Sequence, residues 1–146
     1  RQRIIMKVTL KRINEDYHFE LQNERGHKLY LDNKKEFGGS DLAPSPMELL
    51  LMGVAGCSAI DVISILKKQR QNITSYYTEV EGERVQIDEA KPFKKITVTI
   101  YLEGDIDEQK AQKAAQLSFE KYCSVSKTLE PTATIDYRVK VNNQTV

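Results

Sequence analysis

The side chains best suited to chemistry in this chain of 146 residues are its two cysteines, Cys57 and Cys123. Cys57 lies inside a predicted helix between Gly56 and Ser58, and these small neighbours leave room for another element or a ligand to approach the sulfur. Cys123 lies where a second predicted helix gives way to a turn at Ser124. A thiol at a helix N-terminus is stabilised as the thiolate by the positive end of the helix dipole. Free cysteine also often fills space in a core, so a packing role for either cysteine stays open. We nevertheless expect both cysteines to serve one common site.

Other familiar chemistries lack their sequence patterns. No G-x-G-x-x-G follows a predicted strand and no G-x-x-x-x-G-K is present, so we expect no nucleotide cofactor. The absence of C-x-x-C argues against thioredoxin-type exchange. His18 and His27 could join the cysteines around zinc, but their spacing matches no usual ligand pattern. We therefore expect strand histidines at the surface and no metal.

Asp61 is the acidic residue nearest to the first cysteine on its helix. It follows Cys57 by four residues and so lies on nearly the same helical face. An ionised carboxylate so close to the sulfur opposes formation of a thiolate, unless a cation neutralises it. Because buried acids are usually paired, we expect Asp61 to cap a neighbouring strand or to pair across a dimer.

The helix that carries Cys57 has clear start and stop signals. Ser45 is a natural N-cap, Pro46 suits the first helical position, and Glu48 completes an S-x-x-E capping box. The cationic residues within 67–70 suit the negative end of the helix dipole. These signals predict one long helix that begins at residue 46 and ends in the cationic turn 67–70.

Strands precede this helix. Alternating apolar and polar residues predict strands over residues 6–13, 17–22 and 27–32, which we interpret as an antiparallel meander. The segment 33–44 contains Lys, Gly, Ser and Pro and is predicted to be a loop.

A second group of elements follows the helix. Strands are predicted over residues 76–87 and 94–102, and a last strand covers residues 135–141. Between them, Asp105 and Glu108 form a second capping box that opens a helix through about residue 121. This helix has a narrow stripe of mostly small residues: Ala111, Ala115, Ser118 and Tyr122. A short helical turn follows Cys123. The order β-β-β-α-β-β-α-β predicts an α+β fold in one domain over residues 1–146.

Composition limits the classes of partner. The chain has 22 Lys and Arg against 21 Asp and Glu, so no basic face is predicted, and with no aromatic stacking platform we expect no nucleic-acid partner. Residues 1–5 lack the apolar stretch of a signal peptide, and Met6 is a candidate natural start, with residues 1–5 a non-native leader. Two cysteines without a secretory signal indicate a reducing cytoplasm.

One apolar run, residues 47–66, could be mistaken for a membrane span. It contains Glu48 and Asp61, and its longest uncharged stretch, residues 49–60, is too short to cross roughly 30 Å of hydrocarbon. We therefore expect a buried central helix and no membrane partner.

Three segments together resemble one known family. These are residues 45–50 (S-P-M-E-L-L), 55–58 (A-G-C-S) and 122–129 (Y-C-S-V-S-K-T-L). They resemble the OsmC/Ohr family of thiol peroxidases, in which a helix start of the type [N/S]-P-x-E-L precedes the first cysteine and a C-x-V-S-x-x-L segment carries the second. The resemblance extends to the order of elements and to nearly the full length of the chain.

The resemblance implies a reaction and an assembly. Cys57 would be the peroxidatic thiolate that attacks an organic hydroperoxide, and Cys123 would be the resolving thiol. The resulting disulfide would be reduced by an external dithiol. The family also implies an intertwined homodimer with its active sites at the subunit interface, and it implies no cofactor.

Two further positions follow from the same resemblance. In the family an arginine of the N-terminal meander contacts the reactive sulfur; its best match here is Arg25, and Arg12 is the alternative. The family glutamate that pairs with this arginine lies ten residues before the first cysteine, where this chain has Met47. Glu48 comes one place later and is a possible supporting residue, on the opposite side of an ideal helix from Cys57.

Two functions therefore compete. The first is a thiol-dependent peroxidase that reduces organic hydroperoxides, with a low rate or a different substrate because of the change at residue 47. The second is a non-catalytic binding module of the same fold, in which the cysteines only line a pocket for a small apolar ligand.

Overall fold

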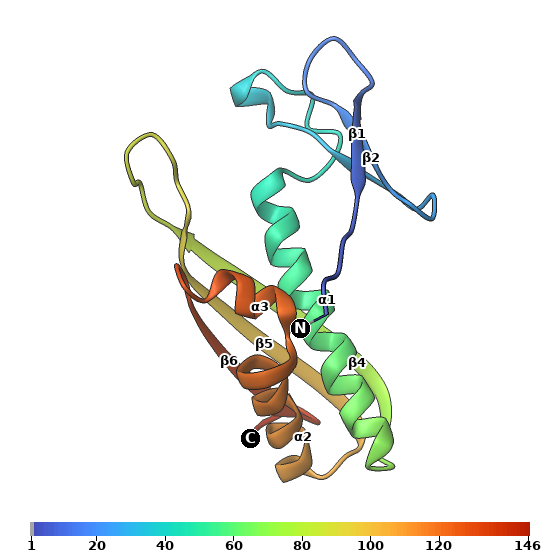
Figure 1. Ribbon diagram of the computed structural model, residues 1–146. Coiled ribbons are helices and arrows are strands. Elements are labelled where there is room, and N and C mark those ends of the chain that lie inside the picture. Colours follow the sequence, from blue (N-terminus) through green and yellow to red (C-terminus); the bar gives the residue numbers. More distant parts are fainter. Residues whose placement is uncertain (1) are drawn as a thin grey trace. The chain divides into compact units, whose positions relative to one another are not determined.

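The computed structural model describes residues 2–146, which divide into two compact units on either side of the Leu50–Leu51 bond (Figure 1). The α+β class expected from the sequence is confirmed. The prediction of a single domain over the whole chain stays a prediction.

The first unit contains a three-stranded meander. Its strands are β1 (Val8–Arg12), β2 (Phe19–Asn23) and β3 (Lys28–Leu31), each antiparallel to the next. This confirms the predicted meander, with strand bounds that differ from the predicted ones by one or two residues. Leu10 pairs with Leu21, and Leu21 pairs with Leu29. The three leucines thus form a row across the sheet, in which Leu10 and Leu29 are exposed.

A buried carboxylate organises the loop that follows the meander. Asp32 accepts hydrogen bonds from the backbone N–H groups of Asn33 at 2.7 Å, Ser40 at 3.4 Å and Leu42 at 3.1 Å. Burial acts to raise the pKa of Asp32, but these three bonds outweigh it and hold the pKa below its ordinary value. The loop also contains the short helix η1 (Lys35–Phe37), which was not predicted from the sequence.

Helix α1 (Pro46–Lys68) begins and ends close to the predicted positions. The capping box is formed: Ser45 N donates to Glu48 Oε1 at 2.9 Å, and Glu48 N donates to Ser45 Oγ at 3.4 Å. In the part of the chain that the structure describes, α1 is the one helix long and apolar enough to cross a membrane, a property that the core helix of a soluble protein shares.

Burial along α1 is confined to one stripe. The fully buried residues recur every fourth position: Val54, Ser58, Val62 and Leu66. On the opposite side Met52, Gly56 and Ile60 are exposed, with Ile60 at 72 %. The expected buried central helix is therefore buried along only one face in the single chain.

The second unit is built on a four-stranded sheet. Its strands, in order across the sheet, are β4 (Asn72–Arg84), β5 (Phe93–Asp105), β6 (Thr134–Val141) and β7 (Gln144–Thr145). β4 and β5 are antiparallel, whereas β5 and β6 are parallel. The short β7 was not predicted, and β4 begins four residues earlier than expected. One face of β5 supplies much of the core through Ile96, Val98, Ile100 and Leu102.

The connection from β5 to β6 contains three consecutive helical segments. These are α2 (Glu108–Leu117), the π-helical turn η2 (Ser118–Tyr122) and α3 (Ser124–Leu129). The predicted N-cap Asp105 is wrong, because that residue still pairs with Asn72 in the sheet. The cap is Asp107, whose Oδ1 accepts from Lys110 N at 2.9 Å.

The π-helical turn also interrupts the predicted stripe of mostly small residues. Ala111, Ala115 and Ser118 of this stripe are buried, but Tyr122 is 50 % exposed. In η2 the N–H of Cys123 donates to Ser118 O at 2.7 Å, five residues back, so the turn holds one residue more than an α-helical turn. The extra residue changes which side chain faces the core, so Cys123 is buried whereas Tyr122 is exposed.

Candidate dithiol site

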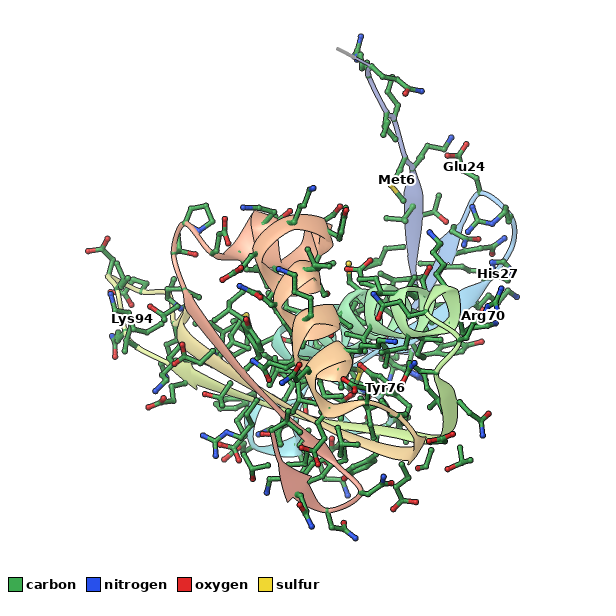
Figure 2. All side chains as sticks on the ribbon, turned by 90° about the horizontal axis from the view of Figure 1, so that it is seen from below. Met6, Glu24, His27, Arg70, Tyr76 and Lys94 are labelled. Carbon is green, nitrogen blue, oxygen red and sulfur yellow. The ribbon has the colours of Figure 1, made fainter. Side chains whose placement is uncertain are left out.

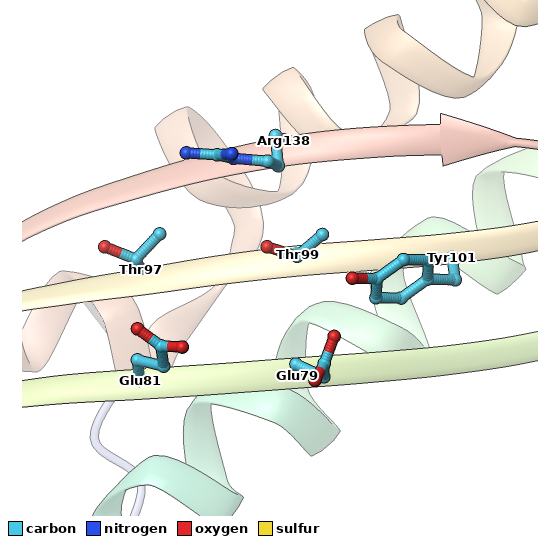
Figure 3. A pocket seen from close by; sticks show the side chains of 6 residues that line it. All are labelled: Glu79, Glu81, Thr97, Thr99, Tyr101 and Arg138. Atoms are coloured by element: carbon cyan, nitrogen blue, oxygen red, sulfur yellow. The ribbon is translucent and has the colours of Figure 1, made fainter. Parts of the chain in front are cut away.

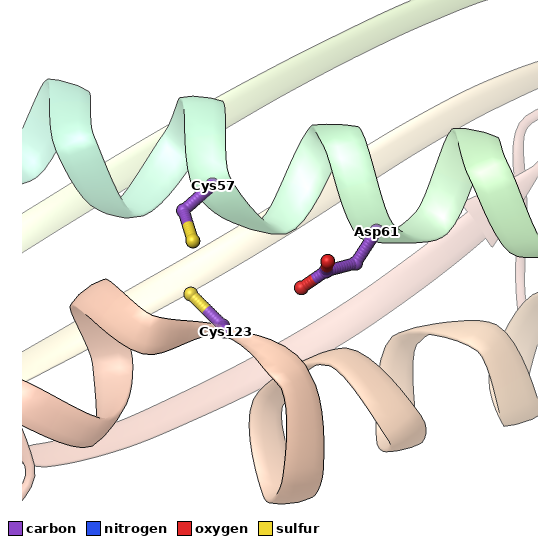
Figure 4. A group of neighbouring side chains, drawn as sticks. All are labelled: Cys57, Asp61 and Cys123. Carbon is purple, nitrogen blue, oxygen red and sulfur yellow. The ribbon is translucent and has the colours of Figure 1, made fainter. Parts of the chain in front are cut away.

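The fold of the second unit brings Cys57 and Cys123 together, although they lie 66 residues apart in the sequence. Their Sγ atoms and one carboxylate oxygen of Asp61 all lie within 4.8 Å of one another. Figure 4 shows the two sulfurs pointing toward each other from α1 and from the start of α3, with the Asp61 carboxylate beside them. Both cysteines are free thiols.

Small residues allow the helices to approach at this point. A Cβ atom at Gly53 would lie 3.6 Å from Val125 Cγ1, so α1 and α3 are in close contact one turn before Cys57. The neighbouring Ser58 is fully buried and donates to Val54 O at 2.8 Å, which satisfies its hydroxyl inside the core. Cys57 itself is half-buried and remains partly open to solvent.

Cys123 is 1 % exposed and caps the N-terminus of α3. Its sulfur accepts from Ser126 Oγ at 3.0 Å and from Ser126 N at 3.4 Å. Burial raises the pKa of the Cys123 thiol, the bonds from Ser126 lower it, and the nearby Cys57 raises it, so the pKa lies above its ordinary value. The position at a helix N-terminus is as predicted, but burial outweighs its stabilisation of the thiolate.

The segment that places Cys123 is anchored on the sheet. Phe119 of η2 is buried, and its ring stacks on Tyr137 of β6 with the ring centroids 4.8 Å apart. Four residues later the chain reaches Cys123. The stacked pair therefore fixes the π-helical turn against β6 and with it the position of the second sulfur.

Asp61 is held by a partner that no pattern in the sequence indicates. Its Oδ2 accepts from Ser118 Oγ at 2.9 Å, and among residues 2–146 it forms no hydrogen bond to a strand, in contrast to the expected strand cap. Tyr76 of β4 is also close: burial, with the negative charge of Asp61 as a lesser cause, raises the pKa of Tyr76 to about 12. The Tyr76 hydroxyl is buried and has no hydrogen-bond partner among residues 2–146.

The remaining predicted site residues belong to the first unit. Arg25 is exposed in the turn between β2 and β3, where its backbone N–H donates to Asn23 Oδ1 at 3.1 Å. His27 and Glu24 lie at the same turn (Figure 2). The guanidinium of Arg12 donates to the carbonyl groups of Glu15 and Asp16. The assignment of either arginine to the sulfur stays a prediction.

Glu48 has a structural role within the first unit. Hydrogen bonds from the backbone and the side chain of Ser45 hold the pKa of Glu48 below its ordinary value. Its carboxylate is thus engaged in the capping box, and its possible support of catalysis stays a prediction.

A second group of polar side chains lines a groove on the face of the four-stranded sheet opposite to the buried Ile96, Val98 and Ile100. Figure 3 shows these residues on three neighbouring strands: Glu79, Glu81, Thr97, Thr99, Tyr101 and Arg138. The Glu79 carboxylate beside its hydroxyl is the main cause that raises the pKa of Tyr101. The groove contains no cysteine or histidine, so its chemistry differs from that of the dithiol site.

The fold and the dithiol site define an OsmC-like protein, and the chain belongs to this family, whose model matches residues 38–138. The family resemblance expected from the sequence is thereby confirmed. Protein YhfA of Escherichia coli K12 is 36 % identical over 121 residues, which cover 82 % of this chain and 87 % of that protein.

Solved structures show the same fold. A hypothetical protein from Aquifex aeolicus VF5 is 30 % identical with a TM-score of 0.78, and the match covers 96 % of this chain and 99 % of that chain. An organic hydroperoxide resistance protein OsmC from Legionella pneumophila superposes with a TM-score of 0.69 at 17 % identity, over 97 % of this chain and 100 % of that one. At that identity the likeness shows the fold alone.

Proposed function

We propose that this protein is a cysteine-based peroxidase that reduces organic hydroperoxides through Cys57 and Cys123. The observation that carries the proposal is the approach of the two sulfurs to within 4.8 Å in one site. The name of the Legionella pneumophila protein of the same fold adds support for the substrate class.

The difference in burial supports an order of reaction for the two thiols. Cys57 is half-buried, whereas Cys123 is 1 % exposed, so a peroxide reaches Cys57 first. The Cys57 thiolate attacks the outer oxygen of the peroxide, the O–O bond breaks, and the alcohol leaves after taking up a proton. Cys57 is then a sulfenic acid.

The second step uses Cys123. Its sulfur attacks the Cys57 sulfenic acid, water leaves with the proton of the thiol, and a disulfide forms. The raised pKa of Cys123 suits a group that stays a thiol until this step. An external dithiol then returns both cysteines to the reduced state by thiol–disulfide exchange.

We propose a low turnover rate. Glu48 is engaged with Ser45, and Met47 occupies the place where the family peroxidases have their glutamate. Asp61 adds a carboxylate beside the sulfurs, which disfavours a second negative charge there. Arg25 is the proposed source of the compensating cation.

We propose that two copies of the chain form a homodimer. The exposed side of α1 has the apolar residues Met52 and Ile60, and a Cβ atom at Gly56 would meet nothing within 4 Å. A second helix could therefore approach closely at Gly56 and cover this stripe. A reducing cytoplasm, which keeps both thiols free, is the proposed compartment.

The test is a peroxide titration of the reduced protein. Cumene hydroperoxide should be consumed at one equivalent per chain, with loss of both thiols and formation of the Cys57–Cys123 disulfide, identified by peptide mapping. Cys123→Ser should stop at a Cys57 sulfenic acid that dimedone labels, and Cys57→Ser should consume no peroxide. The absence of thiol loss with several organic peroxides would refute the proposal.

A non-catalytic binding module is the second candidate. It is favoured by Asp61 and by the raised pKa of Cys123, both of which oppose an ionised dithiol. Cys57→Ser separates the two candidates, because binding of a small apolar ligand should survive this change whereas peroxide turnover should vanish.

A further inference from the structure

We propose that the reduced protein binds one Zn²⁺ ion through Cys57, Asp61 and Cys123. These three side chains come from two segments of the second unit and present their donor atoms to one point (Figure 4). The proposal goes beyond peroxide reduction and does not depend on it.

The spacing of the donor atoms suits a cation of this size. Zinc binds thiolate sulfur at about 2.3 Å and carboxylate oxygen at about 2.0–2.2 Å. In a tetrahedral site two sulfurs bound at that length lie about 3.8 Å apart. The three donors lie within 4.8 Å of one another, so small side-chain rotations close them around the ion.

Two of the three proposed ligands, Asp61 and Cys123, are each oriented by a neighbouring serine hydroxyl. Ser118 Oγ donates to Asp61 Oδ2 at 2.9 Å, and Ser126 Oγ donates to Cys123 Sγ at 3.0 Å. Such outer partners hold metal ligands in place, and their loss typically costs about 10–100-fold in affinity. Ser118 and Ser126 are themselves fully buried, so the arrangement is fixed before any ion arrives.

A cation also explains why a carboxylate lies beside two thiols. Three groups that can each become negative repel one another at this distance when no positive charge is between them. A divalent ion reverses this repulsion and favours both thiolates. The thiolate ligands select zinc over magnesium and calcium, which prefer oxygen.

The partial opening of the site leaves one position free. Cys57 is half-buried, and three protein ligands leave the fourth tetrahedral position for water. A zinc ion held there would engage both sulfurs, so it would also block them from reacting with other molecules.

The test is a metal titration of the full chain, reduced with a phosphine and kept free of peroxide. Zn²⁺ is titrated in competition with a chromophoric chelator, and Co²⁺ serves as the spectroscopic probe. We expect one ion per chain, thiolate-to-cobalt charge-transfer absorption in the near ultraviolet, and the intense visible bands of tetrahedral cobalt.

Three variants assign the ligands. Cys57→Ser and Cys123→Ser should each lose the charge-transfer absorption. Asp61→Asn keeps the shape of the side chain and an acceptor for Ser118. It should weaken Zn²⁺ binding at least as much as the loss of an outer partner does, about tenfold or more. The matched control is the double variant Glu79→Gln and Glu81→Gln, which removes two carboxylates from the sheet groove and should leave the affinity unchanged.

The outcomes that overturn the proposal are distinct. An unchanged Zn²⁺ affinity in Asp61→Asn would show that the carboxylate is not a ligand. Retention of Zn²⁺ binding by either cysteine variant would show that the ion binds elsewhere. Absence of binding by the reduced wild-type chain at micromolar Zn²⁺ would reject the site altogether. Because no peroxide is present, none of these results bears on the peroxidase proposal.

Discussion

Ser118 Oγ donates a 2.9 Å hydrogen bond to Asp61 Oδ2 and thereby joins the end of α2 to the helix that carries Cys57. The two residues lie 57 positions apart in sequence. Ser118 is also the acceptor, through its carbonyl, of the N–H of Cys123. One serine therefore fixes both the carboxylate and the π-helical turn that places the second sulfur.

Replacement of Ser118 by alanine should destabilise the protein. The change removes the hydroxyl that satisfies a half-buried carboxylate, and an unsatisfied group of this kind costs about 1–3 kcal/mol. The free energy of unfolding from urea titrations at neutral pH measures the effect. Ser124→Ala, at an exposed position in α3, is the control and should change it by less than about 0.5 kcal/mol. Equal stability of the two variants would mean that the Asp61 bond contributes nothing.

Local signals in the sequence predicted the elements well. The S-x-x-E pattern at Ser45 and Glu48 involves residues one turn apart, and the structure forms both of its reciprocal bonds. The same pattern at Asp105 and Glu108 failed, because pairing of Asp105 with Asn72 extends β5 and leaves Asp107 as the cap. Sheet pairing is a long-range effect that a local pattern does not contain.

The site was only partly predictable for the same reason. Two cysteine motifs indicated a common site, and the two sulfurs are brought together. A period of 3.6 residues placed Tyr122 on one stripe with Ala111, Ala115 and Ser118, whereas the extra residue in η2 leaves Tyr122 exposed and buries Cys123. The bonds of Ser126 to Cys123 follow from this turn, and no signal in the sequence assigned Ser126 to the sulfur.

Replacement of Ser126 by alanine should make Cys123 less reactive. Its hydroxyl bond to the sulfur lowers the pKa of Cys123, so its loss should raise that pKa further. The rate of alkylation by iodoacetamide, measured against pH in a Cys57→Ser background, should fall severalfold at pH 8 and its midpoint should move to higher pH. Ser124→Ala in the same background is the control and should leave the profile in place. A shift to lower pH in Ser126→Ala would contradict the assigned direction.

Replacement of Ile60 by glutamate should disrupt the proposed homodimer. Ile60 is 72 % exposed in the single chain and lies on the apolar stripe of α1, so a second copy would bury the new charge at a large cost. Sedimentation velocity should show the wild type as a dimer and Ile60→Glu as a monomer at micromolar concentration. Gln86→Glu, which adds the same charge at an exposed loop position, should remain dimeric. A monomeric wild type would refute the proposed homodimer.

Asp32 should make the stability of the first unit depend on pH in the acidic range. The pKa of Asp32 is lowered in the folded protein from an ordinary value of 3.8, because the hydrogen bonds from Leu42, Asn33 and Ser40 favour the carboxylate more than burial disfavours it. A group whose folded pKa is depressed binds protons more weakly in the folded than in the unfolded state. Its contribution to stability is therefore fully present well above pH 3.8 and is lost as the pH falls through the lower, folded pKa.

Asp32→Asn tests this dependence. The asparagine Oδ1 can still accept hydrogen bonds from Asn33 and Ser40. Its NH₂ group, however, cannot accept the bond that Leu42 N donates to Asp32 Oδ2, so this bond is lost. The urea midpoint should fall at pH 7, and the difference from the wild type should shrink as the pH drops below 3.8, because the protonated wild-type side chain then resembles the amide. Asp41→Asn, an exposed change in the same loop, should leave the wild-type acid profile intact. A difference that stays constant from pH 7 to pH 2 would show that the charge of Asp32 does not stabilise this loop.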